Sequence, residues 1–117
     1  GTGSDNLTGG TGAGRFRFDT APNAATNVDH ILDFAVVDDT IFLDRDIFTG
    51  IAANGTLAAA AFKAGTVAPD ADDRIIYDAA TGNIFYDADG TGAVAQILFA
   101  TVTPGAALTN ADFNGYM

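Results

Sequence analysis

Apolar and polar residues alternate in several short segments of the chain, and a period of two is typical of half-buried β-strands. The alternation is clearest where Arg15 and Arg17 alternate with Phe16 and Phe18, which we expect to point inward. Five further segments are rich in Ile, Leu, Val, Phe and Tyr and are expected to be strands: residues 28–34, 39–43, 74–78, 83–87 and 93–101.

Turn-forming residues separate these segments and leave room for one or two short helices. Residues 79–82 predict a hairpin with its glycine in the left-handed conformation. Residues 44–48 predict one helical turn, capped by Asp44, and residues 56–62 have the best helix propensity in the chain. Because strands recur at roughly ten-residue intervals, the pattern predicts an all-β fold with an antiparallel sandwich or roll after residue 28.

The first eighteen residues are two glycine-rich rows of nine residues that align with each other. The third, fifth and seventh places hold Gly3, Asp5 and Leu7 in the first row, and Gly12, Gly14 and Phe16 in the second. In repeats of this kind, glycines permit tight turns and the apolar residue points into a stack. The first row therefore keeps the carboxylate of a calcium-binding nonapeptide, and the second row has lost it.

Composition narrows the class of protein further. With 117 residues and 48% hydrophobic residues, the chain is expected to form one domain, residues 1–117, with a packed core. The net charge is −10, all fifteen acidic residues are Asp, and only five residues are Lys or Arg, which argues against binding to nucleic acid. No apolar run approaches the roughly 18 residues that would span a membrane, so no membrane insertion is expected.

Together these segments resemble the C-terminal region of repeats-in-toxin (RTX) proteins, the hemolysin-type calcium-binding family. The resemblance is carried by residues 10–18, 29–34 and 39–43, and later by residues 74–78 and 86–92. It implies a short parallel β-roll, formed by an RTX repeat remnant at residues 1–18, that runs into a C-terminal β region at residues 28–117. It also implies an extracellular protein, secreted by a type I (ABC) exporter through a signal near the C-terminus, with a passenger domain upstream.

The resemblance also implies that calcium ions (Ca²⁺) bind near the first row. The first candidate site consists of Asp5 and the carbonyl oxygens of Gly1 and Gly3, because calcium takes about six to eight oxygen ligands. Asp29 is expected to complete this site by stacking beside Asp5 as part of a third turn, and Asp33 is a secondary candidate. Alternatively, Asp5 is a turn residue that makes local hydrogen bonds only.

Other candidate ligands are weaker. Residues 87–90 imitate the middle of an EF-hand loop, but its first and twelfth places lack a carboxylate, so a hairpin turn is favoured. The pair Asp38 and Asp39 and the acidic segment at residues 70–73 are expected to be solvated loop charges, with weak calcium binding as the alternative. His30 is the only histidine and the chain has no cysteine, so it is expected to be a strand residue rather than a zinc ligand.

These observations predict a non-catalytic C-terminal module that couples calcium binding to extracellular folding and carries the secretion signal. A serine triad is disfavoured because Ser4, the only serine, lies within a repeat turn, although the module could be the appendage of a secreted enzyme. The competing hypothesis is an extracellular adhesin or polysaccharide-recognition module that uses Tyr77, Tyr86 and Tyr116, with core packing of these rings as its alternative.

Overall fold

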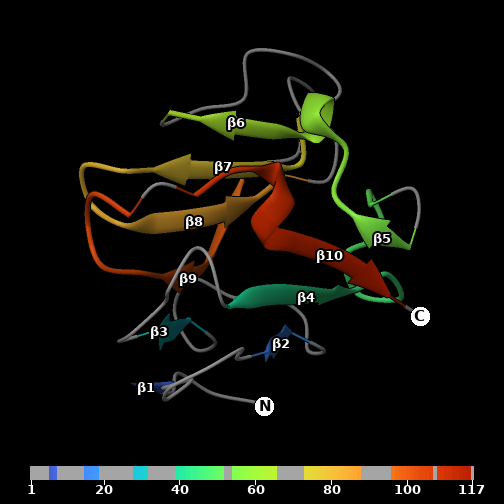
Figure 1. Cartoon of the computed structure of the whole chain (residues 1–117), viewed down its shortest axis with the longest axis horizontal. Coiled ribbons are helices and arrows are strands. Elements are labelled where there is room, and N and C mark those ends of the chain that lie inside the picture. Colours follow the sequence, from blue (N-terminus) through green and yellow to red (C-terminus); the bar gives the residue numbers. More distant parts are fainter. Residues whose placement is uncertain are drawn as a thin grey trace.

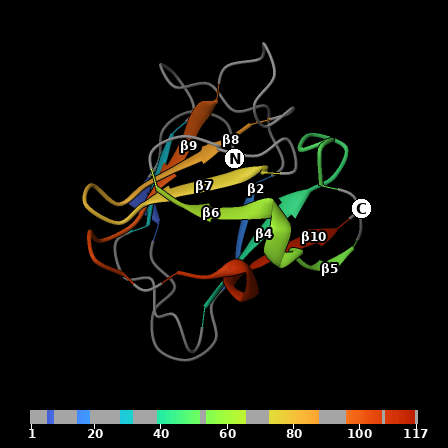
Figure 2. The same cartoon turned by 90° about the horizontal axis from the view of Figure 1, so that it is seen from above.

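The computed structural model describes residues 6–7, 15–18, 28–31, 39–51, 54–65, 73–87, 96–106 and 108–116. Within these ranges the chain forms ten β-strands in two sheets and two 3₁₀ helices, which confirms the all-β prediction (Figure 1). Seen from above, β9, β8, β7 and β6 lie on one side of the molecule, and β4, β10 and β5 lie on the other (Figure 2).

Both sheets are mixed, and their strand order is not the order of the chain. The six-stranded sheet has the order β1 (Asn6–Leu7), β3 (Asp29–Ile31), β9 (Ile97–Thr101), β8 (Asn83–Tyr86), β7 (Ile75–Asp78) and β6 (Phe62–Ala64). The four-stranded sheet has the order β2 (Arg15–Phe18), β4 (Thr40–Asp44), β10 (Phe113–Tyr116) and β5 (Gly55–Thr56). The two helices are η1 (Ala59–Ala61) and η2 (Asn110–Asp112).

The first four strands alternate between the two sheets. β3 pairs in parallel with β1 in one sheet, and β4 pairs in parallel with β2 in the other. The last two strands continue this alternation, because β9 pairs in parallel with β3 and β10 pairs in parallel with β4. The end of the chain therefore adds a third pair of strands beside the first two pairs.

The segment between β4 and β9 extends both sheets on the side away from β1 and β2. β8 is antiparallel to both β7 and β9, and β6 is parallel to β7. β5 is antiparallel to β10. The predicted antiparallel arrangement therefore holds for the pairs β7–β8, β8–β9 and β5–β10. It is wrong for the pairs β3–β9, β4–β10 and β6–β7, which are parallel. Alternation along a strand reports which side chains are buried and not the direction of the neighbouring strand.

Two local turns form where the sequence predicts them. Gly82, with φ at +79°, lies in the predicted hairpin between β7 and β8. Asp44 caps the predicted turn, since its carboxylate accepts the Asp46 N–H at 2.9 Å and its carbonyl accepts the Phe48 N–H at 2.7 Å. These elements depend on contacts between near neighbours in the chain, which is why they are visible in the sequence.

The helix predicted for residues 56–62 is replaced by β5, the short helix η1 and β6. Leu57 explains the change, because its N–H donates to the carbonyl of Phe113 at 2.9 Å and its side chain is buried. This long-range hydrogen bond holds the chain in an extended conformation, and tertiary contacts of this kind override weak helix propensity.

An aromatic cluster joins the two sheets inside the core. The ring of Phe48 packs edge-on against Phe99 of β9, and Phe99 packs edge-on against Phe18 of β2, each at 5.2 Å between ring centroids. Phe16 and Phe18 are both buried, as the alternation predicted. Such edge-to-face pairs add about 0.5–1.5 kcal/mol each to the hydrophobic gain from burial.

Candidate functional site

The predicted calcium ligands fall mostly outside the described residues, where Gly1, Gly3, Asp5 and Asp33 lie. Asp29 is described: it begins β3 and its side chain is only 3% exposed. Asp29 is thus the one predicted ligand that the structure describes, and carboxylate oxygens are a donor type that calcium takes.

The strand that begins with Asp29 lies directly beside β1, the described part of the first glycine-rich row. Asn6 pairs with His30 and Leu7 pairs with Ile31, in a parallel register. Asp5, beside which Asp29 is predicted to stack, lies outside the described residues. In the sequence, Asp5 directly precedes Asn6 just as Asp29 directly precedes His30.

An equivalent pairing exists in the four-stranded sheet. Arg15 of β2 pairs with Thr40 of β4, again in parallel. In the sequence Gly14 precedes Arg15, and Asp39 precedes Thr40. Gly14 and Asp39 thus precede the paired residues Arg15 and Thr40, whereas an Asp precedes each member of the pair Asn6 and His30.

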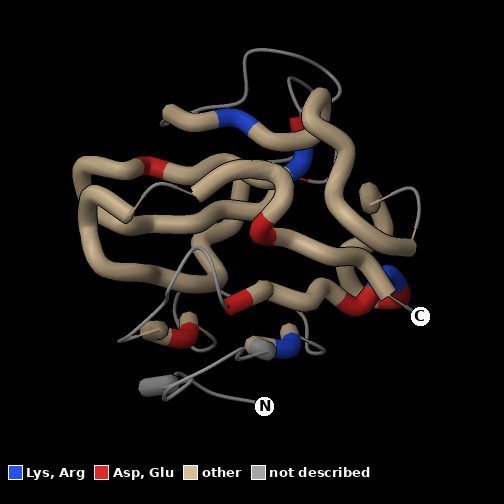
Figure 3. The backbone as a smooth tube through the Cα atoms, viewed as in Figure 1, with Lys and Arg blue, Asp and Glu red and all other residues tan. Residues whose placement is uncertain are grey.

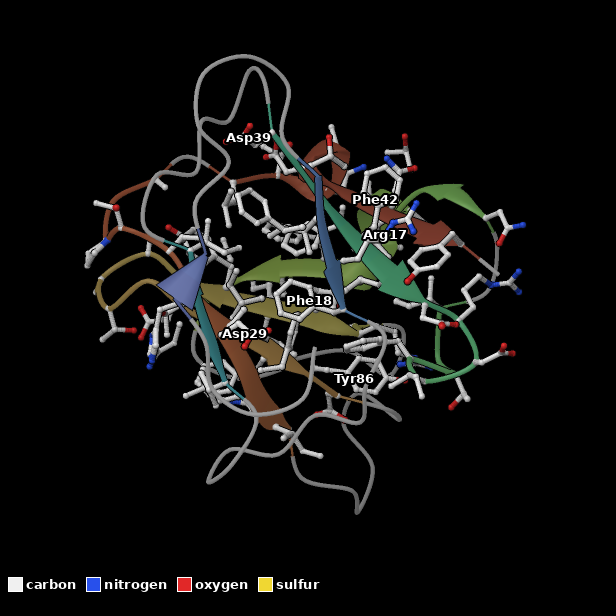
Figure 4. All side chains as sticks on the ribbon, turned by 90° about the horizontal axis from the view of Figure 1, so that it is seen from below. Arg17, Phe18, Asp29, Asp39, Phe42 and Tyr86 are labelled. Carbon is white, nitrogen blue, oxygen red and sulfur yellow. The ribbon has the colours of Figure 1, made fainter. Side chains whose placement is uncertain are left out.

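Several aspartates that the sequence places in loops are buried. Asp39 is 2% exposed and Asp73 is 3% exposed, so the prediction that they are solvated loop charges is wrong. Asp87 is also buried, directly after β8, where its N–H donates to the carbonyl of Arg74 at 2.8 Å. In Figure 4, Asp39 lies at the start of β4, well separated from Asp29.

Asp112 is a buried carboxylate with a defined structural role. Its Oδ2 accepts the Thr109 N–H at 2.8 Å, and the Thr109 hydroxyl accepts the Ala111 N–H at 3.3 Å, which together cap η2. Burial raises the pKa of Asp112 above its ordinary value, and the hydrogen bond from the Thr109 N–H opposes this shift.

His30 lies in β3, as predicted, and its side chain is exposed. Its Nδ1 is 2.6 Å from the Thr101 Oγ1 on the neighbouring strand β9. Among the described residues, no three His, Cys, Asp or Glu side chains lie close enough together to hold a metal ion. Figure 3 shows that charged residues gather mostly at strand ends and in turns.

Two of the three tyrosines proposed for surface recognition belong to the core. Tyr77 and Tyr86 are buried, and the Tyr77 hydroxyl donates to the carbonyl of Ala106 at 2.7 Å. The Tyr86 hydroxyl accepts the N–H of Gly50 at 2.7 Å. Their proposed role in an exposed recognition surface is therefore wrong, and their core-packing alternative is confirmed.

Tyr116, in contrast, lies on the outer face of the four-stranded sheet and is half-buried. Its ring is 6.2 Å from the ring of Phe42, and the guanidinium of Arg17 lies 5.6 Å from the centre of the Tyr116 ring. Figure 4 shows Arg17 and Phe42 close together on one side of β2, with Phe18 on the other side. The sequence signal was the alternation itself, which assigns Arg17 and Phe42 to outward positions.

Comparison with protein-family models, with curated proteins and with solved structures gives no match. No helix in the described ranges is long and apolar enough to cross a membrane.

Proposed function

We propose that this chain is a non-catalytic C-terminal module of an RTX-type secreted protein, in which calcium binding drives extracellular folding. The observation that carries the proposal is the alternation of β1, β2, β3 and β4 between two sheets with parallel partners. A parallel β-roll requires this arrangement, because each turn of the roll contributes one strand to each sheet.

The calcium ligands in this proposal are Asp29 and Asp5, with Asp33 as a secondary ligand and the carbonyl oxygens of Gly1 and Gly3. The parallel register of Asn6 with His30 supports the pairing of the two carboxylates, because each of them directly precedes one of these paired residues. Two carboxylates and several carbonyl oxygens satisfy a hard cation that prefers oxygen donors.

The pair β2 and β4 is proposed to lack an equivalent site. Gly14 occupies the position at which the first row has Asp5, so Asp39 alone would supply a carboxylate there. A single carboxylate gives much weaker binding than two, because site charge is a main determinant of calcium affinity. Calcium would therefore act mainly at Asp5 and Asp29, next to the paired residues of β1 and β3.

Calcium couples to folding in this proposal through charge. The chain carries a net charge of −10, and the mutual repulsion of its carboxylates opposes compaction when no cation is bound. A ligand at about 100 times its dissociation constant stabilises the folded state by about 2.7 kcal/mol. Because the core of β7, β8 and β9 contains no predicted ligand, calcium is expected to stabilise chiefly the N-terminal strands.

Calcium titration tests the proposed site. Isothermal titration calorimetry on the full chain should show binding that Asp29→Asn and Asp5→Ala each weaken, whereas Gly14→Asp should strengthen it. Asp46→Asn is the matched control, because Asp46 is an exposed aspartate in the turn after β4. Heat signals that are flat for the wild type, or equal for the wild type and both ligand variants, would remove the calcium proposal.

The export role needs a separate test. Residues 60–117, fused to a reporter passenger and coexpressed with a type I exporter, should carry the reporter out of the cell. The same reporter fused to residues 1–59 is the control and should remain inside. If both fusions stay in the cytoplasm, the secretion signal does not lie in this part of the chain.

A further inference from the structure

The outer face of the four-stranded sheet carries aromatic side chains that point away from the core. On β4, Ile41 and Leu43 point inward and are fully buried, while Phe42 between them points outward and is half-buried. On β10, Phe113 points inward and Tyr116 outward. Outward positions of a solvated sheet are usually polar, so two neighbouring rings on this face call for an explanation beyond packing.

The two rings lie beside a cation and a row of polar side chains. Phe42 and Tyr116 are 6.2 Å apart, and the exposed Arg17 stacks over Tyr116 at 5.6 Å. One cross-strand row contains Arg17, Phe42, Asn114 and Thr56, which are register partners on β2, β4, β10 and β5. Since adjacent strands lie about 4.8 Å apart, this row is roughly 14 Å long, which suits an extended ligand.

This combination suits a sugar chain. The ring of Phe42 can pack on the C–H face of a pyranose ring, while the ring of Tyr116 holds the Arg17 guanidinium beside it. The guanidinium, amide and hydroxyl of Arg17, Asn114 and Thr56 can hydrogen-bond to sugar hydroxyl groups from the same row. A guanidinium that stacks on an aromatic ring still directs its N–H groups outward in its own plane.

The charge of the protein determines whether a neutral or an acidic sugar chain suits this face. Arg17 and Asp44 bring charges of opposite sign to this face. The net charge of −10 on the whole chain repels polyanions such as nucleic acid or acidic polysaccharides. The guanidinium over Tyr116 in turn occupies the ring face that would attract a cationic partner.

We propose that Phe42 and Tyr116, together with Arg17 and Asn114, form a binding face for a neutral polysaccharide chain. The face belongs to the four-stranded sheet, whereas Asp29 of the proposed calcium site belongs to the six-stranded sheet. Binding is expected to be weak for a single module, because the face is flat and has few hydrogen-bonding groups.

The test is a titration of the ¹⁵N-labelled full chain with short neutral oligosaccharides: β-1,4-glucan, α-1,4-glucan and β-1,3-glucan, each with and without calcium. At least one should shift the amide signals of β4 and β10. Phe42→Thr and Tyr116→Thr should each raise its dissociation constant by about tenfold, which is about 1.4 kcal/mol. The matched control is Phe85→Thr, since Phe85 is a half-buried aromatic residue on β8 in the other sheet and should leave the affinity unchanged.

Thermal unfolding shows whether the variants fold. If either Thr variant does not, Arg17→Gln replaces it, because Arg17 is exposed and its replacement leaves the core unchanged, and this variant should still weaken binding. The proposal is overturned if no neutral oligosaccharide binds, if only alginate binds, or if binding is unaffected by these variants. Dimerisation through this face without any sugar binding would overturn it as well.

Discussion

The ring of Phe48 packs edge-on against that of Tyr86, with 4.9 Å between the centroids and 82° between the ring planes. Phe48 belongs to the turn that follows β4 of one sheet, and Tyr86 ends β8 of the other. Because Phe48 also contacts Phe99 of β9, this one side chain links a turn of the smaller sheet to two strands of the larger sheet.

Replacing Phe48 should be among the most destabilising single changes in the core. Its side chain is fully buried, so Phe48→Ala should lower the free energy of unfolding by about 3–5 kcal/mol through lost burial and a residual cavity. Urea denaturation measures the change. Phe48→Leu should cost much less because it fills most of the volume, and equal losses for the two variants would contradict the role of the cavity.

Gly50 should not tolerate even one added methyl group without rearrangement. A Cβ at this position would lie 2.6 Å from Cδ of Arg74 and 2.9 Å from the hydroxyl oxygen of Tyr86. We expect Gly50→Ala to cost about 1–3 kcal/mol, as overpacking usually does.

A double-mutant cycle with Arg74→Ala separates this contact from other effects of the alanine. Shortening Arg74 removes the closest atom, so the combined variant should lose less stability than the sum of the two single variants. Additive losses, measured by chemical denaturation, would show that Arg74 is not the obstacle.

Asp112 should make stability depend on pH in the acidic range. Burial raises its pKa in the folded protein, so the folded state keeps the proton at pH values where the unfolded chain has lost it. The contribution of Asp112 to stability is therefore greatest below the unfolded pKa and falls as the pH rises through the folded pKa.

Asp112→Asn tests this dependence, because it removes the charge and keeps an acceptor for the Thr109 N–H. Relative to the wild type, the variant should gain stability as the pH rises from about 3.5 to 7. Denaturation curves at several pH values measure the gain, with Asp46→Asn as the exposed control. Wild-type and variant curves that stay parallel over this range would contradict the prediction.

Tyr77 should make stability depend on pH in the alkaline range. Burial, and to a lesser extent the charge of Asp78, raise the Tyr77 pKa above 10.0. Its contribution to stability is full below the unfolded pKa and is lost as the pH rises toward the folded pKa, because the unfolded chain ionises first. Tyr77→Phe should therefore have a flatter stability profile above about pH 10.

At neutral pH the same variant should lose about 0.5–1.5 kcal/mol, the usual net value of one hydrogen bond, since the hydroxyl donates to the carbonyl of Ala106 at 2.7 Å. Denaturation at neutral and alkaline pH separates the two effects. A Phe variant as stable as the wild type at neutral pH would show that this hydrogen bond contributes no net stability.

Part of the candidate site was predictable from local pattern. The glycine-rich rows marked the N-terminal segment, and the apolar residues around Asp29 marked the strand that pairs with it. The burial of Asp39 and Asp73 was not predictable, because adjacent aspartates in a sequence look like solvated loop charges. Burial depends on which strands pack around a residue, and those strands come from distant parts of the chain.

Strands β2, β3, β4, β7, β8 and β9, the hairpin at Gly82 and the inward direction of Phe16 and Phe18 follow from the sequence, because they depend on neighbouring residues and on a period of two. The strands β5 and β6, which replace a predicted helix, and the parallel pairing of β9 and β10 with β3 and β4 depend on the tertiary structure. The physical reason is that both edges of a strand offer hydrogen-bonding groups to any partner. Which partner is chosen depends on the core that the whole chain encloses.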